Sequence, residues 1–314
     1  MSARAAAQIG LVMFLWAICY PLITVRITLS PHLSFAALRA LIAAAVLLGL
    51  AFWLGRPFPR GRQAWMSIVI VGVGATSLGF LGMFHAAEFV SPGIATVIAS
   101  MQPLLAAVLA GLVLGERLSA KARVGLAIGF LGILVIVAPK FLGSGSQNYV
   151  LGIAFVVLAA LGVTVSNVMI KRIAGSIDGL MVMGLQTLIG SIPLIAIALL
   201  TEDPGEIQWT PNFLVSLVGL DVFGTAVVYW LWIDVLARVS LSQANAFSFL
   251  VPVLGLSMGI LLFGETLSLI QVGGIVLTVI GVAAVASGSD QSVNTTGGSV
   301  VKDGAKHPRG DVCA

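Results

Sequence analysis

Charged residues are scarce in this sequence. Asp, Glu, Lys and Arg account for 9% of its 314 residues, whereas hydrophobic residues account for 59%. A soluble domain usually carries about 25% charged residues, and a small domain in water must still expose a large polar surface. The composition therefore excludes an ordinary soluble domain and indicates a chain whose main solvent is lipid.

Cysteine and the common catalytic motifs are also missing or nearly so. Cys19 lies in an apolar run and Cys313 in the polar C-terminal segment, so we expect two free thiols and no metal site. No Gly-x4-Gly-Lys-Ser/Thr run is present, which argues against ATP-driven pumping. No His-Glu-x-x-His motif and no pair of carboxylates occurs within an apolar run. We therefore expect no enzyme activity, no catalytic residues and no cofactor.

Long apolar runs are what the sequence has in abundance. A helix that crosses a bilayer needs about 20 predominantly apolar residues. Barrel strands would alternate apolar and polar residues, and these runs do not. Since backbone groups in lipid must bond internally, helices remain. We predict an all-α polytopic membrane protein with ten transmembrane helices, at residues 8–28, 33–54, 64–87, 91–114, 121–139, 150–170, 177–200, 212–235, 240–262 and 268–287.

Lys and Arg are unevenly divided between the connections. If the N-terminus is cytoplasmic, ten of them lie at cytoplasmic ends, against only Arg26 and Lys140 on the other side. The positive-inside rule then predicts a bacterial inner-membrane protein with both termini in the cytoplasm. The net charge of +4 is spread over these connections, which argues against nucleic acid as a partner. Residues 288–314 are polar, and we expect a disordered cytoplasmic tail.

The sequence contains an internal repeat at an offset of 149 residues, which aligns residues 90–132 with residues 239–281. Chance agreement between apolar helices is common, but matched proline and Gly-Glu positions are harder to attribute to chance. The matched positions are Pro103 with Pro252, Gly115-Glu116 with Gly264-Glu265, Leu118-Ser119 with Leu267-Ser268, and Gly125 and Gly132 with Gly274 and Gly281. The repeat indicates two halves of related structure.

Each half holds five predicted spans, so the second half enters the membrane from the opposite side. We predict a first five-helix repeat at residues 1–140 and a second, inverted repeat at residues 141–287, around a central cavity. Inverted repeats of this kind are typical of secondary transporters, whose substrate site lies near the midplane between the halves.

These residues resemble a known family. The Pro…Gly-Glu-x-Leu-Ser pattern, present twice, resembles the EamA-type repeat of the drug/metabolite transporter superfamily. Trp16-Ala17…Tyr20-Pro21 and Phe35–Arg39 resemble the first two helices of that repeat. Within the superfamily the chain is most similar to YddG-type amino-acid exporters. The resemblance covers residues 8–287 and implies ten helices, cytoplasmic termini and a central cavity, without fixing the substrate.

The two halves differ at one position of interest. Gln186 stands where Arg39 stands in the first half, so a role for that arginine is not duplicated. Arg39 lies inside the second span, where a charge is costly and is a functional candidate by default. It either holds a substrate carboxylate or reaches a helix end or the interface. Asp221 in the eighth span is the candidate for proton coupling, or else a hydrogen-bonded structural acid. His85 and Glu88 lie near a span end, where we expect them to be solvated.

Uncharged polar and aromatic side chains inside the spans are further candidates for substrate binding. Aromatic rings bind apolar groups or cations, although they also form belts at the membrane interface. Small polar side chains line cavities or join helices by hydrogen bonds. The candidates are Trp16, Tyr20, Ser77, Phe80, Phe84, Thr96, Ser100, Gln102, Asn167, Thr225, Tyr229, Trp232, Asn245 and Ser248. Pro103 and Pro252 are predicted to kink the fourth and ninth helices.

The predicted cavity has aromatic and uncharged polar walls and little positive charge. Phosphorylated substrates would need several Lys or Arg groups, so we expect amino acids and related metabolites instead. The prediction is a carrier that exports them by alternating access, as a monomer or a dimer. Three alternatives stay open: a multidrug efflux carrier for lipophilic cations, an ion channel or pore, and, with least support, a membrane-embedded enzyme.

Overall fold

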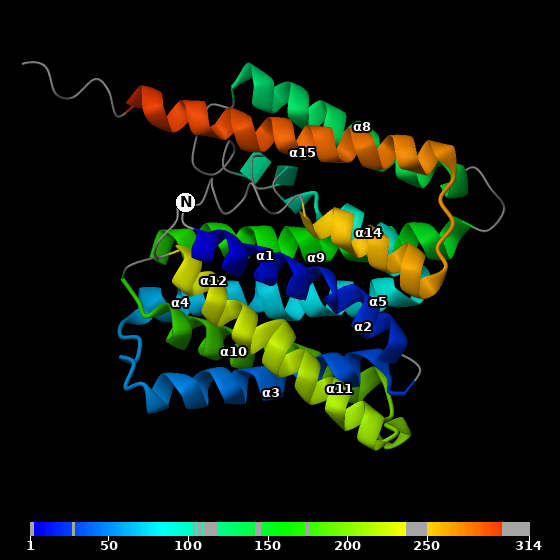
Figure 1. Ribbon diagram of the computed structural model, residues 1–314. Coiled ribbons are helices and arrows are strands. Elements are labelled where there is room, and N and C mark those ends of the chain that lie inside the picture. The colour runs from blue at the N-terminus through cyan, green and yellow to red at the C-terminus, as the bar shows by residue number, and fades with distance from the viewer. Residues whose placement is uncertain are drawn as a thin grey trace, which may run out of the picture.

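A computed structural model describes residues 3–26, 29–102, 104–105, 108–109, 119–141, 146–173, 176–236 and 250–296 of the 314. Figure 1 shows that this part of the chain is a bundle of helices joined by short connections. Six described helices are long and apolar enough to cross a membrane, and three shorter apolar helices and α6 lie at further predicted spans. The predicted all-α membrane architecture with about ten helices is confirmed.

The bounds of the elements are as follows. The first half comprises α1 Ala3–Ala17, α2 Cys19–Arg26, α3 His32–Trp53, α4 Arg62–Val71, η1 Gly72–Leu78, α5 Gly79–Phe89, α6 Pro92–Ala99 and α8 Ala120–Phe141. The second half comprises α9 Ser146–Ile173, α10 Gly179–Thr201, η2 Pro204–Glu206, α11 Pro211–Asp221, η3 Val222–Val227, α12 Val228–Leu236, α14 Leu250–Phe263 and α15 Leu269–Thr296.

Local sequence explains where several helices begin. The Asp178 side chain accepts a hydrogen bond from the Met181 amide at 3.0 Å, which caps α10. The Thr210 hydroxyl accepts one from the Phe213 amide at 3.2 Å, and Pro211 occupies the first turn of α11. Asp and Thr satisfy amides that have no partner inside a helix, and proline has no amide to leave unpaired.

Two long spans contain a π-helical segment at matching places. η1 covers Gly72–Leu78 in the third span, and η3 covers Val222–Val227 in the eighth. The repeat offset of 149 maps residues 72–78 onto residues 221–227, which nearly coincide with η3. π-helices are rare and recur at functional sites. Their presence at matching positions supports the repeat and draws attention to both spans.

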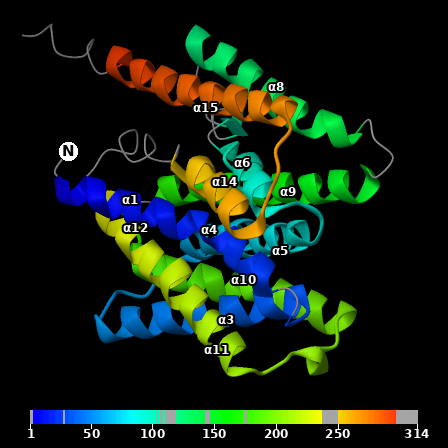
Figure 2. The same cartoon turned by 45° about the vertical axis from the view of Figure 1, so that its right-hand side comes forward.

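The halves pack on each other helix by helix. α3 packs against α10, α6 against α14 and α8 against α15, so helices at corresponding positions of the two halves pair. α1 packs on α12 and η3, while α9 packs on η1 and α5. In Figures 1 and 2, α8 and α15 lie side by side along one edge of the bundle. This reciprocal pairing is what duplicated halves related by a two-fold axis would show.

Glycines allow some of these pairs to approach closely. A Cβ on Gly274 in α15 would lie 2.7 Å from the carbonyl oxygen of Gly132 in α8. A Cβ on Gly255 in α14 would collide with the Thr96 side chain of α6. Small residues at helix crossings permit such contacts in membranes. These glycines therefore serve packing within one molecule.

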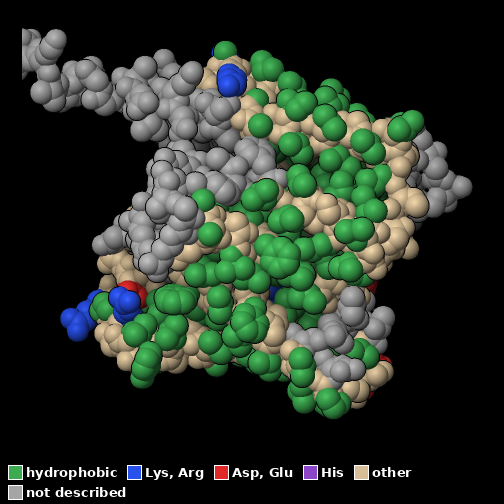
Figure 3. All heavy atoms as spheres, viewed as in Figure 1, with side chains coloured by type: hydrophobic (Ala, Val, Ile, Leu, Met, Phe, Trp, Pro, Cys, Tyr) green, Lys and Arg blue, Asp and Glu red, His purple; other side chains and the backbone are tan. Residues whose placement is uncertain are grey.

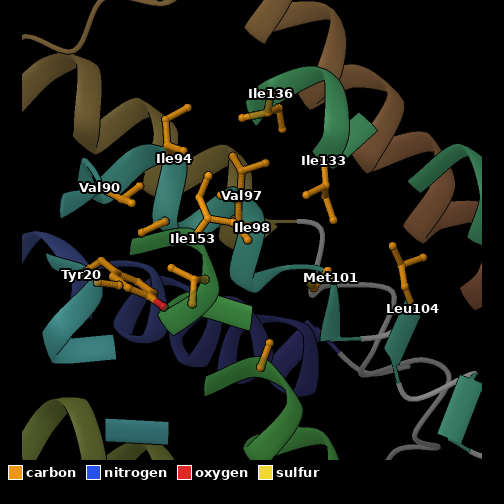
Figure 4. Packing of buried hydrophobic residues seen from close by; sticks show 14 of the residues in the cluster. Tyr20, Val90, Ile94, Val97, Ile98, Met101, Leu104, Ile133, Ile136 and Ile153 are labelled. Carbon is orange, nitrogen blue, oxygen red and sulfur yellow. The ribbon is translucent and has the colours of Figure 1, made fainter. Parts of the chain in front are cut away.

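The outer surface of the bundle is apolar, as lipid requires. Trp53, Leu200 and Leu261 are 82%, 84% and 81% exposed. Figure 3 shows one face of the molecule covered by hydrophobic side chains, with Lys and Arg at its margins. Inside, Figure 4 shows an apolar cluster in which Tyr20 lies among aliphatic side chains such as Ile98 and Ile153.

The last helix differs from the prediction. α15 continues to Thr296, nine residues into the segment expected to be a disordered tail. A helix that has already formed adds each further residue at little cost, so an apolar span can carry polar residues into a helical extension. Residues 297–314 lie outside the described part of the chain.

Candidate functional site

Two opposite charges are buried between the halves. Arg39 lies seven residues after the start of α3, about 10 Å along the helix at 1.5 Å per residue. Asp221 is the last residue of α11, directly before η3. Their exposed fractions are 3% and 0%. One charge comes from each half, so the contact between them depends on how the halves pack.

The ion pair is incomplete. Arg39 Nε lies 3.7 Å from Asp221 Oδ1, which is beyond the range of an N–H···O hydrogen bond. Arg39 Nη2 donates to the Thr225 hydroxyl at 3.3 Å and contacts the Cys19 sulfur at 3.7 Å. Among the described residues, Arg39 Nε and Nη1 and both oxygens of Asp221 have no hydrogen-bond partner. Unsatisfied buried charges are costly and rare, so this arrangement calls for a functional explanation.

An aromatic wall lies against the guanidinium. Arg39 Cζ is 4.9 Å from the ring centroid of Phe80 and 6.0 Å from that of Phe84. Phe35 packs on Phe84 with ring centroids 5.5 Å apart, and Phe213 on Phe35 at 5.6 Å. The ring faces attract the cation and restrict its orientation. The structure thus brings together predicted site residues from α3, α5, α11 and η3.

The contact between Arg39 and Thr225 has an uncharged counterpart elsewhere between the two halves. The Thr76 hydroxyl donates to Gln186 Oε1 at 2.9 Å, and Gln186 Nε2 donates to the Thr187 hydroxyl at 2.8 Å. Thr76 corresponds to Thr225 at the offset of 149, and Gln186 lies seven residues after the start of α10, as Arg39 does in α3. The same contact between a π-helical segment and the second helix of the opposite half, called the crossing contact below, therefore occurs twice. Gly72 stands in the position that corresponds to Asp221.

The remaining aromatic candidates lie in other contacts. Trp16 of α1 and Trp232 of α12 pack with ring centroids 5.2 Å apart. Tyr229 is partly buried against the same apolar cluster. Tyr20 is buried in a different cluster, shown in Figure 4. These rings join α1 and α2 to the second half, but no described contact joins them to Asp221.

Several polar candidates bond to backbone. Ser77 donates to the Gly190 carbonyl at 2.8 Å, Thr96 to Pro92 at 2.7 Å and Ser100 to Thr96 at 2.8 Å. Asn167 is exposed and Gln102 half-buried. None of these side chains is brought to the Arg39–Asp221 pair. Pro252 is buried within α14, and Pro103, Asn245 and Ser248 lie outside the described residues.

The position of Ser77 has a physical cause. In a regular α-helix Ser77 would lie on the same face as Phe80 and Phe84. In the π-helix η1 the hydrogen bonds run from i to i+5, so an extra residue enters the turn and shifts the face. As a result Ser77 meets α10, while Phe80 and Phe84 face Arg39.

Histidine and acidic side chains gather at the end of the bundle where α3 begins. His32 Nδ1 lies 2.6 Å from Glu88 Oε1 and 3.5 Å from Glu202 Oε1, and the His85 ring packs edge-on to His32 at 4.3 Å. The Glu202 carboxylate also accepts hydrogen bonds from the amides of Leu33 and Ser34 at 2.8 and 2.7 Å. Glu88 is exposed, as expected for a residue near a span end, and it also pairs with His32.

A depression of about 390 Å³ opens beside this group. It is lined by residues 29–32, Glu88, Glu206 and Gln208, so Arg39 and Asp221 are not among its lining residues. The candidate site is therefore enclosed within the bundle and separate from this surface depression.

Comparison with known proteins decides the family. The model of the EamA-like transporter family matches residues 4–138 and 150–287. The chain belongs to the EamA-like transporter family. It is therefore a multi-pass membrane transporter and not an enzyme.

Individual EamA relatives are distant. A WAT1-related chloroplastic protein of Arabidopsis thaliana is 31% identical over 79% of this chain and 61% of its own length, so the chain spans less than two thirds of that relative. A probable amino-acid metabolite efflux pump of Salmonella typhimurium is 29% identical over 90% of this chain and 94% of its own length. One solved crystal structure matches 90% of this chain and 96% of its own chain with a TM-score of 0.64 at 21% identity, which shows the fold alone.

The family's Gly-Glu motif has a visible role in this EamA chain. The Glu265 carboxylate accepts hydrogen bonds from the Ser91 hydroxyl and the Gly93 amide, each at 2.8 Å. It thereby caps the start of α6 across the boundary between the halves. Gly259 and Gly93 leave room for this carboxylate, because a Cβ on Gly93 would lie 2.8 Å from Glu265 Oε2. The motif is a packing device here and lies apart from Arg39.

Sequence reasoning missed three residues of the two crossing contacts. Cys19 is a free thiol as predicted, but its contact with Arg39 at 3.7 Å was not predicted, nor was its position 4.0 Å from the Gly224 carbonyl oxygen. Thr76 and Gln186 were not candidates. A signal for them existed, since Thr76 matches Thr225 at the repeat offset and Gln186 replaces Arg39.

Proposed function

We propose that this EamA protein is a secondary transporter that exports amino acids, including aromatic ones, and related small metabolites by alternating access. One observation carries the proposal: a buried Arg39–Asp221 pair lies between the two halves with unused donors and acceptors. A guanidinium presents N–H groups in a planar fork that matches a carboxylate. Arg39 would hold the substrate carboxylate.

The surroundings of Arg39 favour this substrate class. Phe80 and Phe84 supply ring faces for apolar or aromatic side chains. Among the described residues, no second Lys or Arg is paired with Asp221, whereas a phosphate would need several cationic groups. The probable amino-acid metabolite efflux pump of Salmonella typhimurium and the resemblance to YddG-type exporters support the same substrate class.

Alternating access would act on the same residues. With exposed fractions of 3% and 0%, Arg39 and Asp221 can be reached only after helices move. α3 and η3 belong to different halves, so rocking of one half against the other opens the site toward one side. We place the protein in a bacterial inner membrane with both termini cytoplasmic, as a monomer, with a dimer as the alternative.

Efflux of lipophilic cations is the second candidate. Asp221 beside phenyl rings would attract such a cation. Arg39 stands 3.7 Å from the carboxylate, however, and would repel it. Growth in the presence of toxic lipophilic cations, with and without the protein, separates this function from amino-acid export. Saturable counterflow distinguishes a carrier from an ion channel or pore, because a pore does not support counterflow.

Asp221 is also the candidate for coupling to protons, because it is a buried acid between the halves. If the carboxylate carries the coupled proton, Asp221→Asn no longer accumulates amino acid in response to a proton gradient, although it still exchanges amino acid at saturating concentrations. Wild-type protein responds to the gradient. An unchanged gradient response in Asp221→Asn would assign coupling to another group.

The direct test is a panel of amino acids in liposomes that contain the purified protein. We expect saturable counterflow of at least one amino acid, with the signal lost in Arg39→Gln. A panel in which no amino acid moves, with insertion verified, would contradict the proposed function.

A further inference from the structure

Arg39 and Asp221 lie within ion-pair distance of each other but do not form a hydrogen bond. Their closest atoms, Nε and Oδ1, are 3.7 Å apart, near enough to attract and too far to hydrogen-bond. Thr225 and the Phe80 ring hold the guanidinium from other sides, through a 3.3 Å hydrogen bond and a 4.9 Å stacking contact. In the described part of the chain, Nε and Nη1 of Arg39 and both oxygens of Asp221 are thereby left without a hydrogen-bond partner.

A free α-amino acid offers the complementary set. Its carboxylate accepts the parallel N–H groups of a guanidinium. Its ammonium carries three donors and would satisfy the oxygens of Asp221, which only accept when ionised. The substrate carries no net charge and neither does the pair. Exchange of the direct ion pair for two substrate contacts therefore leaves no uncompensated charge in the interior.

We propose that Arg39 and Asp221 form a clamp for zwitterions, in which Arg39 binds the α-carboxylate and Asp221 the α-ammonium of one amino acid. This assignment rests on the proposed function and narrows its substrate class to compounds that carry both groups. The two binding residues come from different halves, Arg39 from α3 and Asp221 from α11, so a bound amino acid would bridge the repeats. Phe80 and Thr225 are positioning residues that aim the unused N–H groups of Arg39.

The clamp rejects singly charged relatives of the substrate. An N-acetyl amino acid places its carboxylate on Arg39 and leaves Asp221 unpaired beside a second anion. An amino-acid amide places its ammonium on Asp221 and leaves Arg39 unpaired beside a second cation. Such unpaired buried charges lower the affinity for the derivatives relative to the free amino acid. Loss of one charge-assisted contact is expected to weaken binding about tenfold to a hundredfold.

The experiment measures binding to the full-length purified chain in detergent. The standard amino acids are screened by their effect on Tm, and the strongest binder is compared with its amide and its N-acetyl derivative by displacement. Wild-type protein should prefer the free amino acid to both derivatives. In Asp221→Asn the preference over the N-acetyl derivative should vanish while the preference over the amide remains. In Arg39→Gln the pattern should reverse.

Controls keep folding separate from recognition. Thr76→Val alters the matching contact of the other half and should keep both preferences. If either single variant fails to fold, Arg39→Gln/Asp221→Asn buries no charge, and in it neither preference should remain. Absence of binding by every amino acid, or equal binding of all three compounds to wild-type protein, would overturn the clamp.

Binding in detergent tests the clamp, and counterflow in liposomes tests the proposed function, so the two results can disagree. Counterflow of amino acids without a preference for zwitterions would overturn the clamp and leave the proposed function standing. Selective binding of zwitterions by a protein that moves no amino acid in liposomes would support the clamp and contradict the proposed function.

Discussion

The two halves make the same crossing contact with opposite character. In one, Thr225 of η3 accepts a hydrogen bond from Arg39 at 3.3 Å, with Asp221 alongside. In the other, Thr76 of η1 bonds Gln186 at 2.9 Å. Both contacts join a π-helical segment to the second helix of the opposite repeat. Duplication thus supplied one scaffold twice, and the residues placed on it differ.

The two crossing contacts differ in how completely their polar atoms are hydrogen-bonded, which is consistent with a packing role for one and a proposed binding role for the other. The neutral contact is complete: Gln186 uses both ends of its amide, and a Cβ on Gly72 would lie 2.6 Å from the Gln186 carbonyl oxygen. The charged contact is incomplete, because Arg39 and Asp221 keep buried polar atoms that have no hydrogen-bond partner among the residues the structure describes. Under the proposed function, the substrate would bind at the charged contact and not at the neutral one.

The largest expected effect comes from breaking the charged contact. Arg39→Gln or Asp221→Asn leaves one buried charge without its partner, which typically costs about 3–5 kcal/mol. The double variant leaves none and should recover most of the stability. Thermal unfolding in detergent checks this order. Additive losses in the double variant would show that the two charges do not interact.

A smaller effect is expected from filling the neutral contact. Gly72→Ala forces a methyl group against the α10 backbone and should cost about 1–3 kcal/mol. Gly219→Ala is the matched control, since no atom lies within 4 Å of its added Cβ. Its stability should be unchanged or slightly higher. Equal thermal shifts in the two variants would mean that Gly72 is not closely packed.

The smallest expected loss of stability comes from replacing Thr76 or Thr225, and the two replacements should differ in their effect on binding. Thr76→Val and Thr225→Val each remove one hydrogen bond, worth about 0.5–1.5 kcal/mol. Their unfolding temperatures should therefore fall by similar amounts. Only Thr225→Val should also weaken amino-acid binding, because its hydroxyl holds Arg39. Equal weakening of binding by both would remove the distinction between the contacts.

Much of the fold could be predicted because its determinants are local. Apolar runs of spanning length predict helices in lipid wherever they occur. The matched Pro and Gly-Glu positions indicate duplication without knowledge of any contact. Gly125, Gly132, Gly274 and Gly281 were matched positions of the repeat, and the structure shows that they lie where α8 packs on α15.

The candidate site was harder to predict because it depends on how the halves meet. Arg39 and Asp221 were both candidates, yet their roles were considered separately and nothing local to either residue indicates the other. Regular periodicity does not allow for the π-helix η1, so it could not indicate that Ser77 bonds the Gly190 carbonyl of α10. Cys19 carries no sequence signal for a contact with a charge 20 positions away.

Counterflow of amino acids in liposomes, compared between wild-type protein, Arg39→Gln and Thr76→Val, tests the central claim most directly. If substrate binds at the charged crossing, wild-type protein and Thr76→Val exchange amino acid and Arg39→Gln does not. Exchange that survives in Arg39→Gln, or that is lost equally in properly folded Thr76→Val, would contradict the claim.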